Sequence, residues 1–155
     1  MMATMPRFPG LTIPAAQSLN NAAARDRQIA AAADRALVPL IYGEDRIGAL
    51  IANVLPAGAN SGTLLVQCIW GYALDSINDV LLNDLALPAG ATVTHYTGAQ
   101  TVADAALVAA FAAQSITYTS TLAGYAYSVV AMPTRAFDGQ LNVTARLRGR
   151  RLYDP

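Results

Sequence analysis

The chain has 155 residues, a length typical of one domain, with ten acidic and ten basic residues. Zero net charge excludes a whole-molecule attraction to nucleic acid or anionic lipid, and a single cysteine excludes an intrachain disulfide and a cysteine-based zinc site within one chain. The apolar share is 54% and the charged share only 13%, against about a quarter charged in ordinary domains. So few charges leave apolar patches exposed on a monomer, which favours an obligate oligomer or assembly component.

No stretch reaches the roughly 18 consecutive apolar residues of a membrane-spanning helix. The beginning of the sequence also lacks the charged-then-apolar order of a signal peptide, so we expect a soluble chain made in the cytoplasm. Residues 1–36 are predicted to form a proline-broken extended arm followed by an alanine-rich helix that is capped by Asn20 or Asn21 and ends near Ala33. Residues 37–155 are predicted to form a single β-rich domain.

The stretch 35–55 predicts a β-hairpin with a charged tip. Two apolar runs of strand length, 38–42 and 47–55, flank the polar tetrad 43–46, whose first residue is a glycine suited to a short turn. Pro39 cannot donate to a strand ladder, which places the first arm at a sheet edge or at a bulge. Both arms are apolar on two faces, which indicates that the hairpin packs against other parts of an assembly.

Strand patterns continue along the chain. Residues 56–62 have the composition of a turn. We predict strands at 63–72, 80–82, 91–97, 122–132 and 141–148. In the first of these, Leu64, Val66, Cys68 and Trp70 share one face, and Leu65, Gln67 and Ile69 share the other. For residues 75–84, periodicity leaves a helical turn open as the alternative to a turn with a short strand, and we favour the strand.

One further helix is predicted. Thr101 to Asp104 resembles a capping box and opens an alanine-rich run that ends at Ala113. Together these elements predict a mainly β (α+β) fold, with an antiparallel sheet or β-barrel-like architecture and one or two short alanine-rich helices. No internal repeat and no linker divides the chain.

Residues with catalytic potential are few. His95 is the only histidine and lies in a predicted strand, where a structural role is far more common than acid–base catalysis. Asp75, Asp79 and Asp84 form the densest group of carboxylates; a glycosidase pair or a calcium site is one interpretation, and capping of short elements is the favoured one. No glycine pattern matches a phosphate-binding loop. We expect no enzymatic activity, no cofactor and no metal.

Basic residues cluster near the end of the sequence, at Arg146, Arg148, Arg150 and Arg151. A phosphate-binding patch is one interpretation, but the chain has neither a second basic region nor a net charge to attract a polyanion. Arginine is also well suited to bidentate pairing with carboxylates across protein interfaces. We therefore favour ion pairs between subunits over contact with nucleic acid.

Four segments resemble, in the same order, motifs of the tail-tip attachment proteins of long-tailed phages, the central tail hub family. They read VPLIYGEDRIGALI (38–51), IWGYALDSINDVLLND (69–84), GYAYSVVAMP (124–133) and LNVTARLRGRRLYDP (141–155). The resemblance implies a β-rich hub domain, related to tail-tube folds, that assembles as a trimer and closes the distal end of the tail tube without catalysis. Arg46 occupies the arginine position of the first motif, which makes it a further candidate interface residue.

Members of this family usually continue for many hundreds of residues past the Tyr-Asp-Pro motif, where this sequence stops. The expectation is that the hub is split between genes or that a partner supplies the remaining domains. We thus expect a virion structural protein at the tail tip, made in the host cytoplasm, whose partners are its own copies and the neighbouring tail and tip proteins. The alternative is a carbohydrate- or cell-wall-binding β module, hydrolytic if Asp75 and Asp79 act as a pair.

Overall fold

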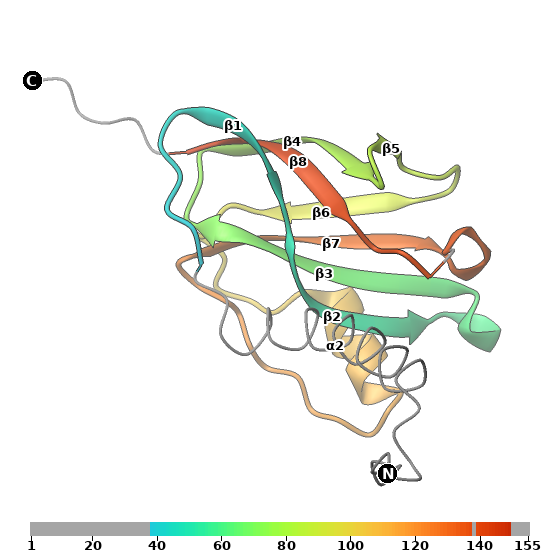
Figure 1. Cartoon of the computed structure of the whole chain (residues 1–155). Coiled ribbons are helices and arrows are strands. Elements are labelled where there is room, and N and C mark those ends of the chain that lie inside the picture. Colours follow the sequence, from blue (N-terminus) through green and yellow to red (C-terminus); the bar gives the residue numbers. More distant parts are fainter. Residues whose placement is uncertain (1–37, 138, 150–155) are drawn as a thin grey trace, which may run out of the picture. The chain divides into compact units, whose positions relative to one another are not determined.

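The computed structural model describes residues 38–137 and 139–149, which form two antiparallel sheets and one helix (Figure 1). The strands are β1 (Glu44–Gly48), β2 (Leu50–Ala57), β3 (Thr63–Tyr72), β4 (Ser76–Leu82), β5 (Leu85–Ala86), β6 (Thr92–Tyr96), β7 (Tyr125–Pro133) and β8 (Val143–Arg148), and the α-helix is α2 (Ala105–Ala112). Single 3₁₀ turns cover Ala59–Ser61 and Thr134–Ala136. The mainly β prediction is confirmed, whereas the predicted arm and helix in residues 1–36 lie outside the described residues.

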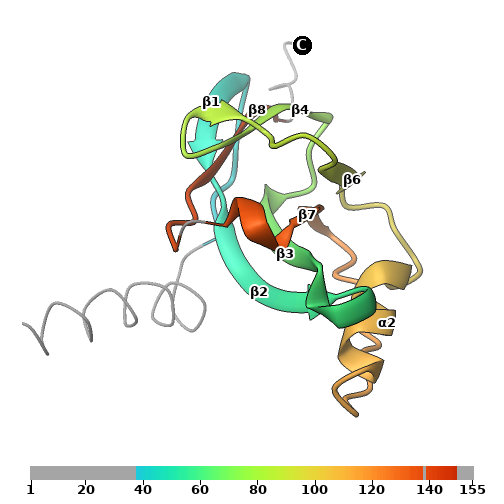
Figure 2. The same ribbon diagram turned by 90° about the vertical axis from the view of Figure 1, so that its right-hand side faces the viewer.

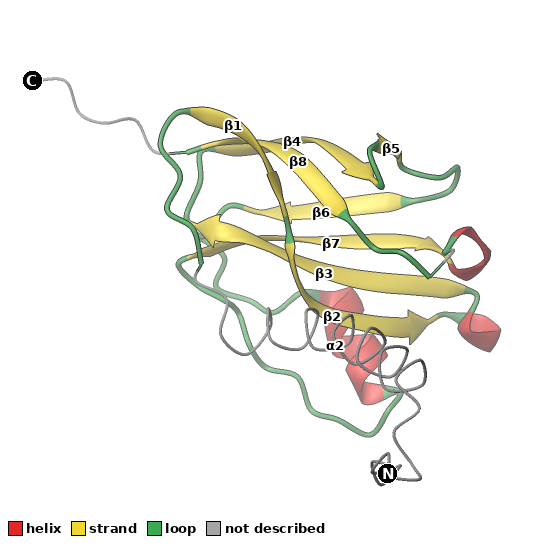
Figure 3. Ribbon diagram, viewed as in Figure 1, coloured by secondary structure: helices red, strands yellow, loops and turns green. Residues whose placement is uncertain are grey.

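The strands form two four-stranded sheets. One has the order β1-β8-β4-β5 and the other the order β2-β3-β7-β6, with antiparallel pairing throughout. The chain passes from β1 to β2 through Ala49 alone, so an edge strand of one sheet leads directly into an edge strand of the other (Figure 3). Within the described residues no strand pairing joins the two sheets, so the sheets are open and the barrel-like form of the prediction is not the one adopted.

The hairpin predicted for residues 35–55 is wrong. Residues 44–46 of its supposed tip belong to β1, which pairs with β8 almost a hundred residues later, and the second arm becomes β2, which pairs with β3. A local hairpin would have paired the two apolar arms with each other and left their second faces uncovered. Pairing with β8 and β3 instead lets Ile47 and Leu55 pack into the two hydrophobic clusters of the domain.

The segment that precedes β1 passes close to the ends of two strands. Tyr72 donates its backbone N–H to the carbonyl of Pro39 at 3.3 Å, and Gly149 donates to Gly43 at 2.7 Å. A Cβ on Gly71 would lie 2.6 Å from the carbonyl oxygen of Pro39, and a Cβ on Gly149 would overlap the backbone of Ile41. Both positions therefore require glycine for close backbone approach.

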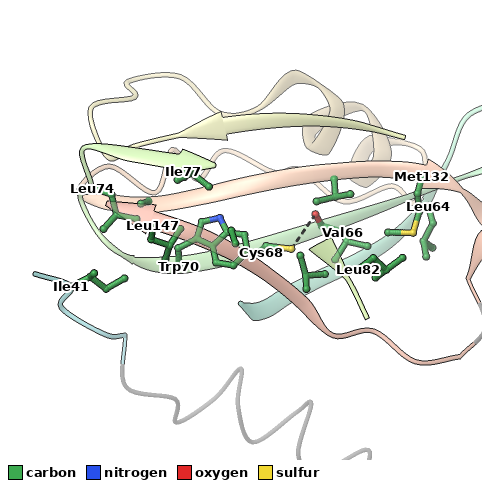
Figure 4. Packing of buried hydrophobic residues seen from close by; sticks show 14 residues of the cluster. Ile41, Leu64, Val66, Cys68, Trp70, Leu74, Ile77, Leu82, Met132 and Leu147 are labelled. Atoms are coloured by element: carbon green, nitrogen blue, oxygen red, sulfur yellow. Dashed lines mark hydrogen bonds between the residues drawn. The ribbon is translucent and has the colours of Figure 1, made fainter. Parts of the chain in front are cut away.

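The main core fills the space between the two sheets (Figure 4). The shared face predicted within residues 63–72 is confirmed, because Leu64, Val66, Cys68 and Trp70 all belong to this cluster. The facing sheet contributes Ile77, Leu82, Val143, Ala145 and Leu147. The alternation predicted for residues 141–148 is thus confirmed, with the apolar residues of β8 inward and its arginines outward.

A second, smaller cluster covers the opposite side of the β2-β3-β7-β6 sheet, where α2 packs (Figure 2). Leu107 and Ala110 of the helix contact a sheet surface that includes Leu65 and Tyr127. Gln67 is buried here as well. Its side chain accepts a hydrogen bond from Asn53 at 2.6 Å and donates one to the Tyr118 hydroxyl at 3.1 Å, so its polar atoms are satisfied.

The start of α2 differs from the predicted capping box. Asp104, not Thr101, is the N-cap, and its Oδ1 accepts the backbone N–H of Leu107 at 2.9 Å. Its Oδ2 accepts the hydroxyl of Tyr96 at 2.7 Å, which ties the helix start to β6. Aspartate is itself a strong N-cap, and this second bond from the sheet fixes the start three residues later than predicted.

The other element predictions agree with the structure apart from their ends. The strand 63–72 is found with the predicted bounds, and 91–97 and 122–132 correspond to β6 and β7. The favoured strand at 80–82 exists as the longer β4, and the turn at 56–62 is shorter because β2 extends to Ala57. The two-residue strand β5 was not predicted.

Replacement of Asp104 by alanine should destabilise the domain by about 1–3 kcal/mol, because both the helix cap and the Tyr96 bond are lost. Asp104→Asn should retain most of this stability, since its amide oxygen still caps Leu107. Asp75→Ala, at an exposed aspartate, is the matched control. Urea unfolding would measure all three variants, and equal stability of Asp104→Ala and wild type would contradict the assigned cap.

Candidate functional site

The outward surface of the β1-β8-β4-β5 sheet carries the predicted arginines. We call it the arginine face, and it comprises Glu44, Arg46, Ser76, Asn78, Asp79, Thr144, Arg146 and Arg148. The strand register places Arg46 opposite Arg146, and Arg148 between Glu44 and Ser76. Three of the five predicted interface arginines are therefore brought together, and Arg150 and Arg151 lie outside the described residues.

Two carboxylates of the same chain offset the repulsion between the paired arginines. Arg146 lies 3.6 Å from Glu44 (Nε to Oε1) and 3.9 Å from Asp79 (Nη1 to Oδ2), and Arg46 donates to the backbone carbonyl of Asp79 at 3.1 Å. Like charges directly opposite on neighbouring strands repel, so these contacts stabilise the β1–β8 register. The side chains of both ion pairs are more than half exposed, which limits each pair to about 0.2–1 kcal/mol.

A bulge in β4 positions Asp79. The β4–β8 register shifts between Asn78 and Leu81, and Asp79 has a φ of 48°, in the left-handed region. Asp and Asn adopt this conformation more readily than other non-glycine residues. The bulge presents both the carbonyl and the carboxylate of Asp79 to the arginines. Sequence reasoning missed this role and that of Glu44, because neither the bulge nor the β1–β8 pairing leaves a local pattern.

Arg148 differs from its two neighbours on the arginine face. Its backbone carbonyl accepts the N–H of Asp75 at 2.8 Å, but within residues 38–137 and 139–149 its guanidinium forms no ion pair or hydrogen bond. The side chain is exposed. Arg148 is thus an arginine on this face available to a carboxylate of another molecule.

The three aspartates singled out from the sequence do not converge. Asp75 lines a surface pocket of about 370 Å³ with Ala73, Leu74, Thr97, Gly98 and Ala99. Asp79 belongs to the arginine face, and Asp84 lies exposed in the β4–β5 turn. The pocket that Asp75 lines therefore lacks a second carboxylate, as a glycosidase would need, and the described residues contain no group of three potential metal ligands from His, Cys, Asp and Glu.

His95 forms a hydrogen bond with a serine, but the geometry does not suit nucleophilic catalysis. Its Nδ1 lies 2.7 Å from the Oγ of Ser128, a distance compatible with a nucleophile and its base. Ser128, however, has no exposed surface, and its oxygen also accepts the indole N–H of Trp70 at 2.7 Å. A substrate cannot reach this oxygen, so the pair is a structural contact.

Cys68 is also unsuited to chemistry at neutral pH. It lies in the inter-sheet core with no exposed surface, and burial raises its pKa to about 12. The thiol rather than the reactive thiolate therefore predominates. No helix in the described part of the chain is long and apolar enough to span a membrane.

No protein-family model matches this chain, and no curated protein or solved structure matches it significantly. The tail-hub resemblance therefore stays a prediction from the sequence.

Removal of the Arg146 side chain should lower the unfolding free energy by about 0.5–1 kcal/mol at low salt, because two ion pairs are lost. The loss should shrink at 0.5 M salt, where exposed pairs are screened. Arg148→Ala is the matched control in the same strand and should leave the stability of the monomer unchanged. Equal losses for both variants in urea unfolding would contradict the assigned pairing.

Cys68 should react with a thiol reagent at pH 8 only after unfolding. The raised pKa keeps the sulfur protonated at this pH, and the core excludes the reagent. Absorbance of the released chromophore, followed with and without 6 M urea, measures this protection. Fast labelling in buffer alone would contradict the packing of β3.

Proposed function

We propose that this chain is a structural component of a phage tail tip: a hub domain that forms a homo-oligomeric ring, a trimer, at the distal end of the tail tube and links it to further tip proteins. The observation that carries the proposal is the convergence of three of the four tail-hub motifs, the fourth of which supplies β7 of the other sheet. The segments 38–51, 69–84 and 141–155 supply β1, β4 and β8, which are adjacent strands of one sheet. Motifs separated by up to a hundred residues thus contribute to one surface, the arginine face.

The exposed apolar side chains support an assembly. Leu40 and Tyr42 are each 53% exposed and Tyr72 is 45% exposed. Leu40 and Tyr72 lie near each other, since the backbone N–H of Tyr72 donates to the carbonyl of Pro39. Tyrosine and large aliphatic residues that gather on a surface with few charges are typical of protein–protein interfaces.

The state of the polar groups favours an adaptor over an enzyme. Ser128 and Cys68 are buried, and the pocket beside Asp75 includes no second carboxylate. Catalysis usually needs a reachable nucleophile or an acid–base pair at one site. Ser128, Cys68 and the pocket beside Asp75 offer neither arrangement.

Arg148 is the residue of the arginine face that we expect to contact a neighbouring molecule. Arg46 and Arg146 already contact Glu44 and Asp79 within the chain. A free guanidinium beside them suits bidentate pairing with a carboxylate of the next subunit or of a tip protein. Arg148 would contact the neighbouring molecule directly, whereas Arg46 and Arg146 would stabilise the sheet on which Arg148 lies.

The alternative function is a carbohydrate- or cell-wall-binding module. The pocket beside Asp75 favours it, because carboxylate and hydroxyl groups at a surface pocket can bind sugar hydroxyls. The hydrolytic version is disfavoured, since Asp79 faces Arg146 on the arginine face rather than lining this pocket.

The purified chain should form an oligomer of three times the 16.2 kDa protomer mass in size-exclusion chromatography with light scattering. Arg148→Ala should weaken this oligomer at least tenfold in dissociation constant without changing monomer stability, and Arg135→Ala is the control at an arginine outside the arginine face. Since assembly can need partner proteins, mass spectrometry and immunogold microscopy of purified virions form the second arm. A monomer at all concentrations together with absence from the tail tip would overturn the proposal, and pull-down by cell walls would favour the alternative.

A further inference from the structure

Two consecutive hydrogen bonds link His95, at the edge of one sheet, through Ser128 to Trp70 in the core. His95 lies on β6, the outermost strand of its sheet, directly opposite Ser128 on β7. The Oγ of Ser128 lies 2.7 Å from His95 Nδ1 and 2.7 Å from Trp70 Nε1. The indole is aimed at Ser128 because the β3–β7 register shifts between Ile69 and Gly71, so that Trp70 is the extra residue of a bulge.

The donor and acceptor roles of these three side chains determine which atom carries each proton. The indole N–H of Trp70 can only donate, so it donates to Ser128 Oγ. The hydroxyl proton of Ser128 then needs an acceptor, and the described residues offer it no partner other than His95 Nδ1. A neutral imidazole protonated on Nε2 supplies this acceptor. In that state the indole N–H of Trp70, the hydroxyl of Ser128 and Nδ1 of His95 are all hydrogen-bonded.

Protonation of His95 breaks this arrangement. An imidazolium is a donor at both nitrogens, so Nδ1 can no longer accept from Ser128. Ser128 Oγ would then receive two donors, and its own proton would remain unpaired in the core, a costly state. Burial of the imidazole already lowers the pKa of His95 from 6.5, and we expect the hydrogen bond that Ser128 donates to the neutral imidazole to lower it further.

Among the described residues, no charged group contributes to the pKa shift of His95. On the face of the sheet that carries His95, β3 contributes Trp70 and β7 contributes Ser128. Of the acidic residues in and beside β4, Asp75 and Asp84 are exposed, and Asp79 is paired with Arg146. None of these carboxylates is a cause of the lowered pKa.

We propose that His95, Ser128 and Trp70 form an acid-sensitive latch: neutral His95 fastens the edge strand β6 to the inter-sheet core, and its protonation releases that link. The latch is independent of the proposed tail-tip function. Its contribution to stability is complete above pH 6.5, the pKa of the unfolded histidine, and is lost as the pH falls through the lower native pKa. An edge strand is where a sheet can open or accept another strand, so β6 is the element that acid should loosen.

The chain contains a single histidine, so NMR can follow its imidazole C–H signals without assignment. The wild-type titration midpoint should lie below 6.5. In Ser128→Ala the neutral imidazole loses its donor, and the midpoint should move up toward 6.5. A wild-type midpoint at or above 6.5 would overturn the latch, as would a Ser128→Ala midpoint that stays where the wild type has it, since burial alone would then account for the shift.

A second measurement does not depend on the folding of Ser128→Ala. His95→Asn keeps an acceptor close to the position of Nδ1 but cannot titrate. Urea unfolding of wild type and His95→Asn from pH 4.5 to 7.5 gives a difference curve from which the common carboxylate titrations cancel. The wild type should lose stability relative to the variant as the pH falls below 6.5, and amide exchange, corrected for its intrinsic rate, should accelerate in β6 before β3. A flat difference curve would overturn the proposal.

Discussion

The fold depends on the need to cover two strands on both faces. β3 and β7 pair along almost their whole length and carry apolar side chains on either side. A strand of this kind is stable only when both of its faces are removed from water. The β1-β8-β4-β5 sheet covers one face and α2 with the following loop covers the other, so the position of every other element follows from this central pair.

The arginine face is the outward surface of the β1-β8-β4-β5 sheet, whose other surface covers β3 and β7. Its arginines can be charged and exposed because Val143, Ala145 and Leu147 of the same strand bury the opposite face. Burial of the apolar residues therefore directs Arg146 and Arg148 outward. The ion pairs of Arg146 with Glu44 and Asp79 add a smaller stabilisation at that surface. Core packing sets the location of the candidate interface, and the weaker electrostatic contacts set its charge pattern.

Local patterns predicted what depends on local chemistry. The faces of residues 63–72 and the alternation ending at Arg148 followed from period-two burial, and the helix from its alanine content. The prediction of a hairpin at residues 35–55 was wrong because the sequence of a strand does not indicate which distant strand it pairs with. For the same reason the sequence indicated the arginines but not their partners: Glu44 meets Arg146 through the β1–β8 register, and Asp79 through a bulge.

The glycines at 71 and 149 have a consequence for how the domain can vary. They allow the backbone of residues 39–43 to cross the ends of β3 and β8 at close range, and that crossing leads the chain into β1. A larger residue at position 71 would collide with the backbone of Pro39, and one at position 149 with the backbone of Ile41, so either would displace this crossing segment. Variation among related chains should therefore accumulate in the β4–β5 turn and on the exposed side of α2, while these two buried glycines stay as invariant as the core.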